Sequence, residues 1–262
     1  MKINATEIRK AILEMVHGAS SGHLGGSFSI ADIISVLYSN FKLSTGVDDK
    51  LILSKGHAVP AVYAALYLCD KIKKEELKTF REINSRLQGH PDKVRFPNVV
   101  ATTGSLGQGL SIAIGHAIGH KLRKVKDNVF CILGDGEMQE GQVWESIMLA
   151  PKFKLDNLCC FLDLNGAQND GNVEDILSLN MGKDISEKIL SFGWHVEIID
   201  GHNEDAILKA IKKEIKGKSK FIIACTKKGK GVSFMETPEW HAKAPNIDQY
   251  EKAIKELNNE SN

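Results

Sequence analysis

Short, uninterrupted apolar runs constrain the fold of this chain more than any other feature. They occupy residues 129–133, 158–164, 195–199 and 221–226, and helix-like patterns separate them. Runs of this length, flanked by Gly and Asp, are typical of parallel strands buried on both faces. The intervening helices would supply βαβ crossovers. The pattern therefore predicts an α/β fold with a doubly wound, mostly parallel sheet flanked by helices.

The N-terminal part of the chain favours helices separated by loops. Asn4 followed by Glu7 predicts a helix start, and apolar residues then recur at helical spacing. Residues 17–29 are rich in Gly, Ser and His and favour a shaped loop, whereas 32–38 is helical again. A loop at 54–57 precedes an Ala-rich helix reaching about residue 69, and 71–81 favours a charged surface helix.

Length and charge limit the class of protein. With 262 residues, of which 42% are apolar, the chain can bury the core of one large domain spanning 1–262, with a tail from about 251 that we expect to fray. The 34 basic and 33 acidic residues nearly cancel. Nucleic acid or an anionic membrane surface is therefore a poor candidate partner.

Cysteine usage favours a reducing compartment. The five cysteines form no CxxC pair, and four of them fall in apolar stretches that we expect to be buried. The N-terminal residues contain no apolar run of signal-peptide or membrane-span length. We expect a cytoplasmic protein without disulfides.

A candidate metal site follows two consecutive predicted strands. Asp135, in the sequence GDGE, ends the first strand, and Asn165 ends the next. Ligands of open α/β sheets lie at the carboxyl ends of the strands, so both side chains can point to one place. With the carbonyl of Ala167 they would supply half of an octahedral magnesium shell, and Gly136 would admit a phosphate. Either motif alone would more simply be a turn; the pair favours a site.

Histidines in flexible loops indicate a polar substrate. His23, His57, His90 and His241 each lie beside Gly or Pro, where an imidazole can approach hydroxyls and move protons. None has a second ligand at the spacing that zinc sites use, which argues against zinc. A Gly-rich segment, TTGSLGQG, precedes a small-residue helix at 111–119 but lacks the spacing of a dinucleotide fingerprint.

Taken together, the motifs resemble a known family. The chain carries, in order, SGHLGG, LSKGHA, GHPD, TTGSLGQG, GDGE, QEGQVWE, DLNGAQNDG, GWH, DGH, TKKGKGVSFME and WHAKAP. This set is similar to the N-terminal region of transketolases and covers about residues 5–250. The resemblance implies the thiamine-diphosphate-binding fold, in its diphosphate-binding domain.

The resemblance also implies roles for individual residues. Asp135, Asn165 and the carbonyl of Ala167 would bind Mg²⁺, or Ca²⁺ or Mn²⁺ in its place. The cofactor diphosphate would be surrounded by His57, Gly136, Asn165 and His241, and its rings by Gly104, Ser105 and Leu106. His23, His90 and His241 would act on the sugar, and Glu140 would lie at a subunit interface near the active site.

The sequence does not contain the pyrimidine-binding and C-terminal domains of full-length transketolases, which include the glutamate that activates the cofactor. We therefore expect the N-terminal subunit of a split transketolase, which would work with a separate C-terminal subunit in a dimer of heterodimers. Such an enzyme would transfer a two-carbon ketol unit between sugar phosphates, as in the pentose phosphate pathway. The alternatives are a half-enzyme acting on another ketose or a 2-oxo acid, and a non-catalytic cofactor-binding relic.

Overall fold

The computed structural model describes residues 2–168, 171–172 and 181–259, and its centre is a five-stranded parallel sheet. The strand order is β1-β2-β3-β7-β6. Their bounds are Lys50–Leu53 (β1), Val129–Gly134 (β2), Leu158–Leu164 (β3), His195–Asp200 (β6) and Lys220–Cys225 (β7). All four pairings are parallel, so the fold class predicted from the apolar runs is confirmed.

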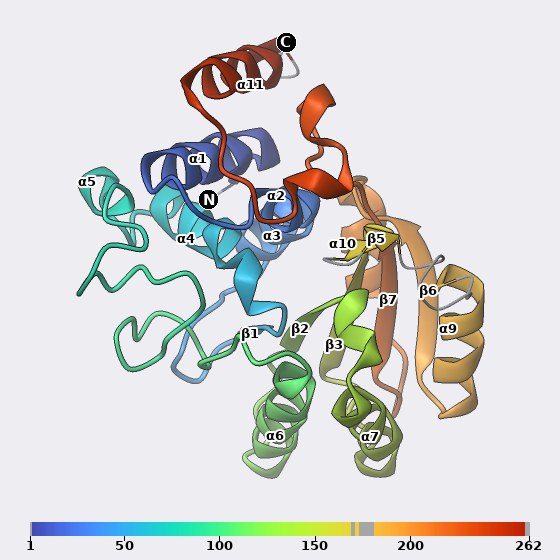
Figure 1. Cartoon of the computed structure of the whole chain (residues 1–262). Helices are drawn as coiled ribbons and strands as arrows, with labels where there is room; N and C mark the ends of the chain where they lie inside the picture. Colours follow the sequence, from blue (N-terminus) through green and yellow to red (C-terminus); the bar gives the residue numbers. More distant parts are fainter. Residues whose placement is uncertain (1, 169–170, 173–180, 260–262) are drawn as a thin grey trace.

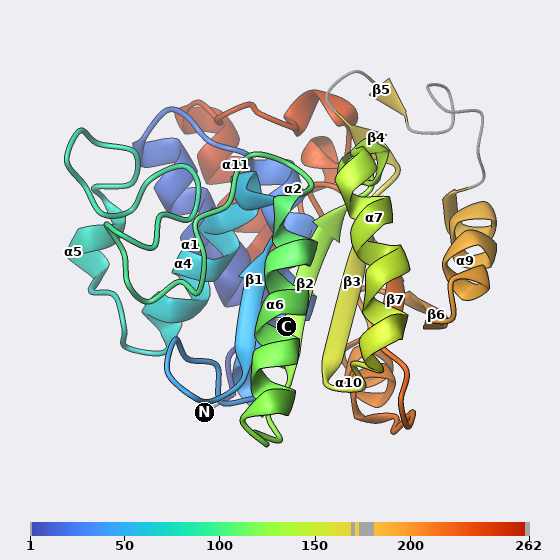
Figure 2. The same ribbon diagram turned by 90° about the horizontal axis from the view of Figure 1, so that it is seen from below.

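Helices cover both faces of this sheet (Figure 1). One buried core joins the sheet to α1–α4, α10 and α11, and a second joins it to α6, α7 and α9. Figure 2 shows α6 and α7 lying side by side across the second face. The helices are α1 (Ala5–Gly18), α2 (Leu24–Ser29), α3 (Ala31–Asn40), α4 (Val59–Leu68), α5 (Lys74–Leu77), α6 (Gln108–Leu122), α7 (Gly141–Leu149), α9 (Met181–Ser191), α10 (Glu204–Lys212) and α11 (Ile247–Asn259).

The central strands are buried because their side chains face helices on both sides. Every residue of β2 is buried, and so is all of β3 except its last residue. This explains why the sequence shows continuous apolar runs there rather than alternation. Asp163 is the exception within β3, since it is a fully buried carboxylate at the carboxyl end of the strand.

Turns at the carboxyl ends of the strands lead into short elements. The 3-10 helices Gly56–Ala58 and Gly136–Gln139 follow β1 and β2. A two-stranded antiparallel ribbon, β4 (Ala167–Gln168) and β5 (Gly171–Asn172), comes shortly after β3. Parallel strands bring these turns to one edge of the sheet, where ligands bind in such folds. Within the described residues, no helix is both long and apolar enough to cross a membrane.

The structure corrects several local predictions. Residues 24–29 form α2 instead of a loop, because all six residues are buried and packing outweighs the weak helix preference of glycine. Only Lys74–Leu77 of the predicted 71–81 helix is α-helical. The four-residue strand β1 was not predicted from the sequence, since it is short and begins with Lys50.

Two further expectations concern the chain's surface. The sequence predicts a tail that frays from about 251, whereas within the described residues α11 continues to Asn259 and buries Ala253 and Leu257 against the first core. Cys225 is exposed at the end of β7, so three cysteines, not four, are buried. The helix starting after Asn4 is confirmed, with the Asn4 side chain accepting from the backbone of Thr6.

Candidate active site

A cavity of about 290 Å³ opens at the carboxyl edge of the sheet. It is lined by residues of the turns after β1, β2, β3 and β7 and of the segment that precedes α11. Seven of the residues predicted from the sequence line it: His57, Leu106, Asp135, Gly136, Glu140, Asn165 and His241. Its size approaches that of small-molecule sites, which makes it the candidate active site.

The four loop histidines meet beside this cavity. The ring centroid of His23 lies 5.1 Å from that of His57, 5.5 Å from that of His241 and 6.4 Å from that of His90. The ring centroids of His57 and His241 are 5.4 Å apart. These side chains come from four separate segments of the chain, so their convergence is a property of the fold and not of local sequence.

The surroundings keep these imidazoles uncharged at neutral pH. Burial, aided by nearby cations, lowers the pKa of His23 to about 4 and that of His241 to about 4. Burial also lowers the pKa of His57 well below its ordinary value, and that of His90 in the same direction. A neutral imidazole can both donate and accept a hydrogen bond, which suits proton transfer to and from hydroxyl oxygens.

Asp135 bridges the turns that follow β2 and β3. Its Oδ1 accepts from the backbone nitrogen of Gly136 at 2.8 Å, and its Oδ2 accepts from that of Gly166 at 2.8 Å. Burial and then the nearby carboxylate of Asp163 raise its pKa to about 6. A divalent cation would offset both the cost of burying the Asp135 charge and its repulsion by Asp163, so this carboxylate fits a metal site.

Asn165 stands next to Asp135 at the same edge of the cavity. Its side-chain nitrogen donates to Oδ2 of Asp163 at 2.8 Å, which fixes the orientation of the amide. The amide oxygen is the atom that a metal would use. Ala167 follows as the first residue of β4, so its carbonyl belongs to the same turn. Among the described residues no three His, Cys, Asp or Glu side chains form a metal cluster. The predicted ligand set is not of that type, because it combines one carboxylate with an amide oxygen and a backbone carbonyl.

A buried ion pair that was not predicted from the sequence lies beside Asn165 at the carboxyl edge of the sheet. Lys55 and Asp163 are 1% and 0% exposed, and the lysine amine donates to Oδ2 of Asp163 and to the carbonyl of Gly26. The same carboxylate also accepts from Ser29, Thr226 and Asn165. Burial disfavours the charged acid, but Lys55 and the hydrogen bonds outweigh it and lower the pKa of Asp163.

A second missed lysine borders the cavity. Lys228 is 4% exposed, and its amine lies 2.9 Å from Nδ1 of His241. Burial, together with the charge of Lys55, lowers its pKa to about 8. Two cations thus stand near one cavity, an arrangement that attracts an anionic ligand. The clue in the sequence was the repeated Lys-Gly pairing in SKG and KKGKG.

Glu137, also missed, organises the glycine-rich segment. One carboxylate oxygen accepts from the Ser54 hydroxyl at 2.5 Å and from the backbone nitrogen of Gly107 at 2.7 Å. Gly104, with φ of 143°, packs so closely on His90 that a Cβ would lie 2.9 Å from its ring. Ser105 is exposed in the same loop, and Leu106 faces the cavity. Glu140 is exposed at the start of α7 and contributes to the cavity wall.

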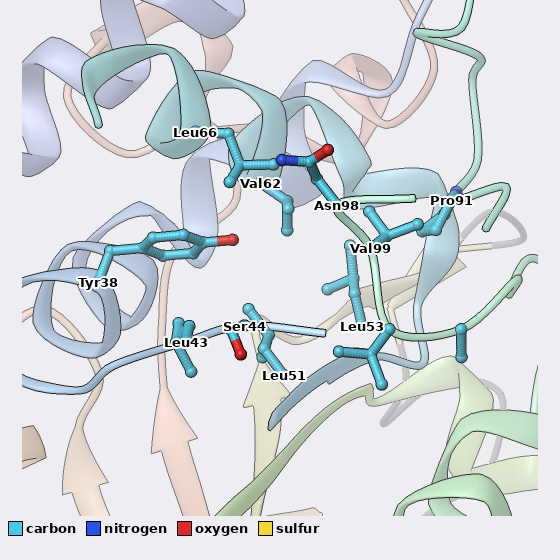
Figure 3. A pocket seen from close by; sticks show the side chains of 12 residues that line it. Tyr38, Leu43, Ser44, Leu51, Leu53, Val62, Leu66, Pro91, Asn98 and Val99 are labelled. Atoms are coloured by element: carbon cyan, nitrogen blue, oxygen red, sulfur yellow. The ribbon is translucent and has the colours of Figure 1, made fainter. Parts of the chain in front are cut away.

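A separate, smaller cavity lies away from the histidines (Figure 3). Its volume is about 40 Å³, and it lies between α3, α4, β1 and the segment 91–101. Leu43, Leu51, Val62 and Leu66 supply much of its wall, with Tyr38 pointing across it. Its wall has no cluster of titratable side chains among the described residues, so it does not compete as a catalytic site.

Comparison with known proteins gives consistent matches. Residues 2–259 match the family model described as "Transketolase, thiamine diphosphate binding domain". The 6-deoxy-6-sulfo-D-fructose transketolase subunit of a Clostridium species is 41% identical, over 88% of this chain and 86% of that protein. An apulose-4-phosphate transketolase subunit from Phocaeicola vulgatus is 34% identical, over 98% of this chain and 93% of that protein. The crystal structure of transketolase from Campylobacter jejuni superposes with a TM-score of 0.88 at 31% identity, covering 97% of this chain and 42% of that one.

Proposed function

The chain belongs to the transketolase family, and from this premise we propose that it is the N-terminal subunit of a split, thiamine-diphosphate-dependent transketolase. The enzyme transfers a two-carbon ketol unit from a ketose to an aldose. The observation that carries the proposal is the cluster of four uncharged loop histidines, of which His57 and His241 line the same cavity as Asp135 and Asn165. The histidines favour sugar chemistry over the 2-oxo acid and binding-relic alternatives, because a relic needs no groups for a substrate.

The residues around the cavity fit the cofactor and its metal ion. Asp135, Asn165 and the Ala167 carbonyl would hold the ion, for which we propose Mg²⁺, since carboxylate and carbonyl oxygens are its usual ligands. Gly136, His57 and His241 would border the diphosphate, and Gly104, Ser105 and Leu106 the rings. We add Lys228, whose amine in the cavity wall would neutralise phosphate charge.

The cofactor, when bound, supplies the carbon that carries the two-carbon unit. The chain's own histidines would handle protons. A neutral imidazole of His23 or His241 can take a proton from a sugar hydroxyl and return it to a carbonyl oxygen. His90, the most exposed of the four, would face the sugar from the outer side of the cluster. His23 and His57 are half-buried, which limits the access of water to the protons being transferred.

A separate C-terminal subunit would complete the active site. Similar proteins of comparable length are named as transketolase subunits, which supports two polypeptides for this enzyme as well. We propose a dimer of heterodimers, with Glu140 at the subunit interface near the cavity. The substrates would be sugar phosphates such as those of the pentose phosphate pathway. We also propose a cytoplasmic location, in keeping with cysteines that form no CxxC pair in the sequence.

A reconstitution experiment tests the function. The purified chain is mixed with candidate C-terminal subunits, thiamine diphosphate and Mg²⁺, and ketol transfer between pentose phosphates is measured. We expect transfer with the matching partner and none from the chain alone. Binding of thiamine diphosphate by the chain, with no ketol transfer in the presence of any candidate subunit, would favour the non-catalytic binding relic.

Three variants separate cofactor binding from turnover. Asp135→Ala should abolish metal-dependent cofactor binding, whereas His23→Ala should bind the cofactor and lose at least about a hundredfold in turnover. His116→Ala is the matched control, because His116 lies on α6 in a different surface groove and should change neither. The reverse pattern for Asp135 and His23 would contradict the assigned roles.

A further inference from the structure

His202 lies outside the histidine cluster, in the turn after β6, yet both of its ring nitrogens are engaged. Nδ1 lies 2.7 Å from Oδ2 of Asp32 on α3, and Nε2 lies 2.8 Å from the backbone nitrogen of Lys227. A backbone N–H is always a donor, so Nε2 must present its lone pair and Nδ1 must carry the proton. The two contacts therefore fix a single tautomer and ring orientation.

Asp32 is itself held firmly. The guanidinium of Arg9, on α1, donates to Oδ2 of Asp32 and also to the carbonyl of Phe28 at 3.3 Å. Arg9 is 3% exposed, so this contact lies in the protein interior. Burial opposes the charge on Asp32, but the His202 hydrogen bond and the Arg9 charge outweigh it and lower the pKa of this carboxyl. His202 is thus anchored through Asp32 to two packed helices.

The other end of His202 holds a segment that enters the candidate site. Lys227 is exposed, and its backbone nitrogen would face solvent without the imidazole. The next residue, Lys228, turns inward and places its amine beside His241. Gly229 then donates to the carbonyl of Gly25 at 3.2 Å. Backbone contacts therefore hold the chain on both sides of the inward-facing lysine.

We propose that His202 is a positioning residue, which holds the backbone of Lys227 so that the Lys228 amine stays inside the candidate site. The chain of contacts runs from Arg9 through Asp32 and His202 to the loop after β7. The effect of these contacts on binding of the cofactor diphosphate rests on the proposed function, whereas their effect on the position of Lys228 does not. This role explains why a histidine outside the site uses both of its nitrogens in contacts between separate segments.

Two substitutions distinguish positioning from general support. His202→Asn keeps a donor near the place of Nδ1, and so the Asp32 contact, but its amide stops short of Lys227. His202→Gln extends an amide oxygen to the place of Nε2, and so keeps the acceptor for Lys227. Trace labelling of the apo chain with acetic anhydride across pH, read by mass spectrometry, reports the apparent pKa of Lys228, which we expect at about 8 in the unaltered protein.

We expect His202→Asn to raise this apparent pKa towards that of an ordinary lysine, because the amine leaves its buried place, and His202→Gln to retain it. Thiamine diphosphate affinity with Mg²⁺ should fall about tenfold in the Asn variant and less in the Gln variant. Equal behaviour of the two variants, or no change in either, would overturn the proposal. If the unaltered protein binds no thiamine diphosphate, the proposed function fails while the labelling result still decides on His202.

Hydrogen exchange gives a measurement that needs no variant. The amide of Lys227 belongs to an exposed residue, so it should exchange near the intrinsic rate unless His202 accepts its hydrogen bond. We expect at least about tenfold protection at neutral pH. An unprotected Lys227 amide would refute the contact on which the proposal depends, even if His202→Asn failed to fold.

Discussion

Replacing Gly109 by Ala should destabilise the protein, although Ala is the better helix former. Gly109 lies in the first turn of α6, where a Cβ would come within 2.6 Å of the Cα of Ser54 and nearer still to its Cβ and Oγ. Ordinary contacts between such atoms are about 3.5–4.0 Å, so α6 or Ser54 must move by about 1 Å. The atoms in the way belong to Ser54's backbone and first side-chain positions, which have no flexible end to swing aside.

The cost can be worked out from the contacts. Overpacking of this kind costs about 1–3 kcal/mol. Ser54 also donates to the buried carboxylate of Glu137 at 2.5 Å, and weakening a hydrogen bond to a charged group costs about 1.5–3 kcal/mol. The helix preference for Ala returns at most about 1 kcal/mol. We therefore expect the free energy of unfolding to fall by about 2–4 kcal/mol.

Gly115→Ala, in the same helix, is the matched control. A Cβ there would meet nothing within 4 Å, and the residue is exposed, so this variant should gain about 0.5–1 kcal/mol. Urea-induced unfolding followed by circular dichroism compares both variants with the unaltered chain. If Gly109→Ala proved as stable as Gly115→Ala, the close approach of α6 to Ser54 would be wrong.

Three further outcomes can be tested on the isolated chain. Lys55→Met should cost about 3–5 kcal/mol by leaving the Asp163 carboxylate buried without its cation, and adding Asp163→Asn should restore part of the loss, as a double-mutant cycle would measure. His23 and His241 have folded pKa values of about 4, below that of the unfolded chain at about 6.5, so their contribution to stability is present above pH 6.5 and is lost as pH falls towards 4. The double variant His23→Gln/His241→Gln should therefore lose less stability than the unaltered chain between pH 7 and pH 5 in urea unfolding. Thiamine diphosphate with Mg²⁺ at about a hundredfold above its Kd should add about 2.7 kcal/mol and raise Tm by about 5–10 °C, and EDTA or Asp135→Ala should cancel the rise in a thermal scan.

The sequence predicts the strands of the sheet that contain a continuous apolar run. β2, β3 and β7 could be predicted because apolar residues fill both of their faces, and β6 could be predicted from its apolar run although this edge strand is only partly buried. β1 has four residues and little pattern to detect. The Gly-rich segment around α2 was misjudged because glycine's weak helix preference was overridden by packing. Gly25 lies so close to Lys228 that a Cβ would be 2.5 Å from its Cγ, and only glycine permits that approach.

The candidate site was partly visible in the sequence. Asp135, Asn165 and the loop histidines could be named because Gly-flanked polar residues at strand ends point to function. The distances between these side chains could not be predicted, because the side chains come from segments that lie far apart in the sequence. Asp163 also carries information in the sequence. A carboxylate inside the apolar run LCCFLDL requires a buried partner, and that partner is Lys55.

Glu137 has a consequence for how affinity for anions can change in this protein. Its carboxylate already accepts from the Gly107 nitrogen, and the Ser54 hydroxyl accepts from the Gly109 nitrogen, so two donors at the start of α6 are used internally. Elsewhere a helix start often binds phosphate through its backbone, which no single substitution removes. In the proposed active site part of this task falls to side chains, such as the Lys228 amine, that a single codon change can replace. The anion affinity proposed for this site is therefore open to adjustment one residue at a time, without rebuilding a helix.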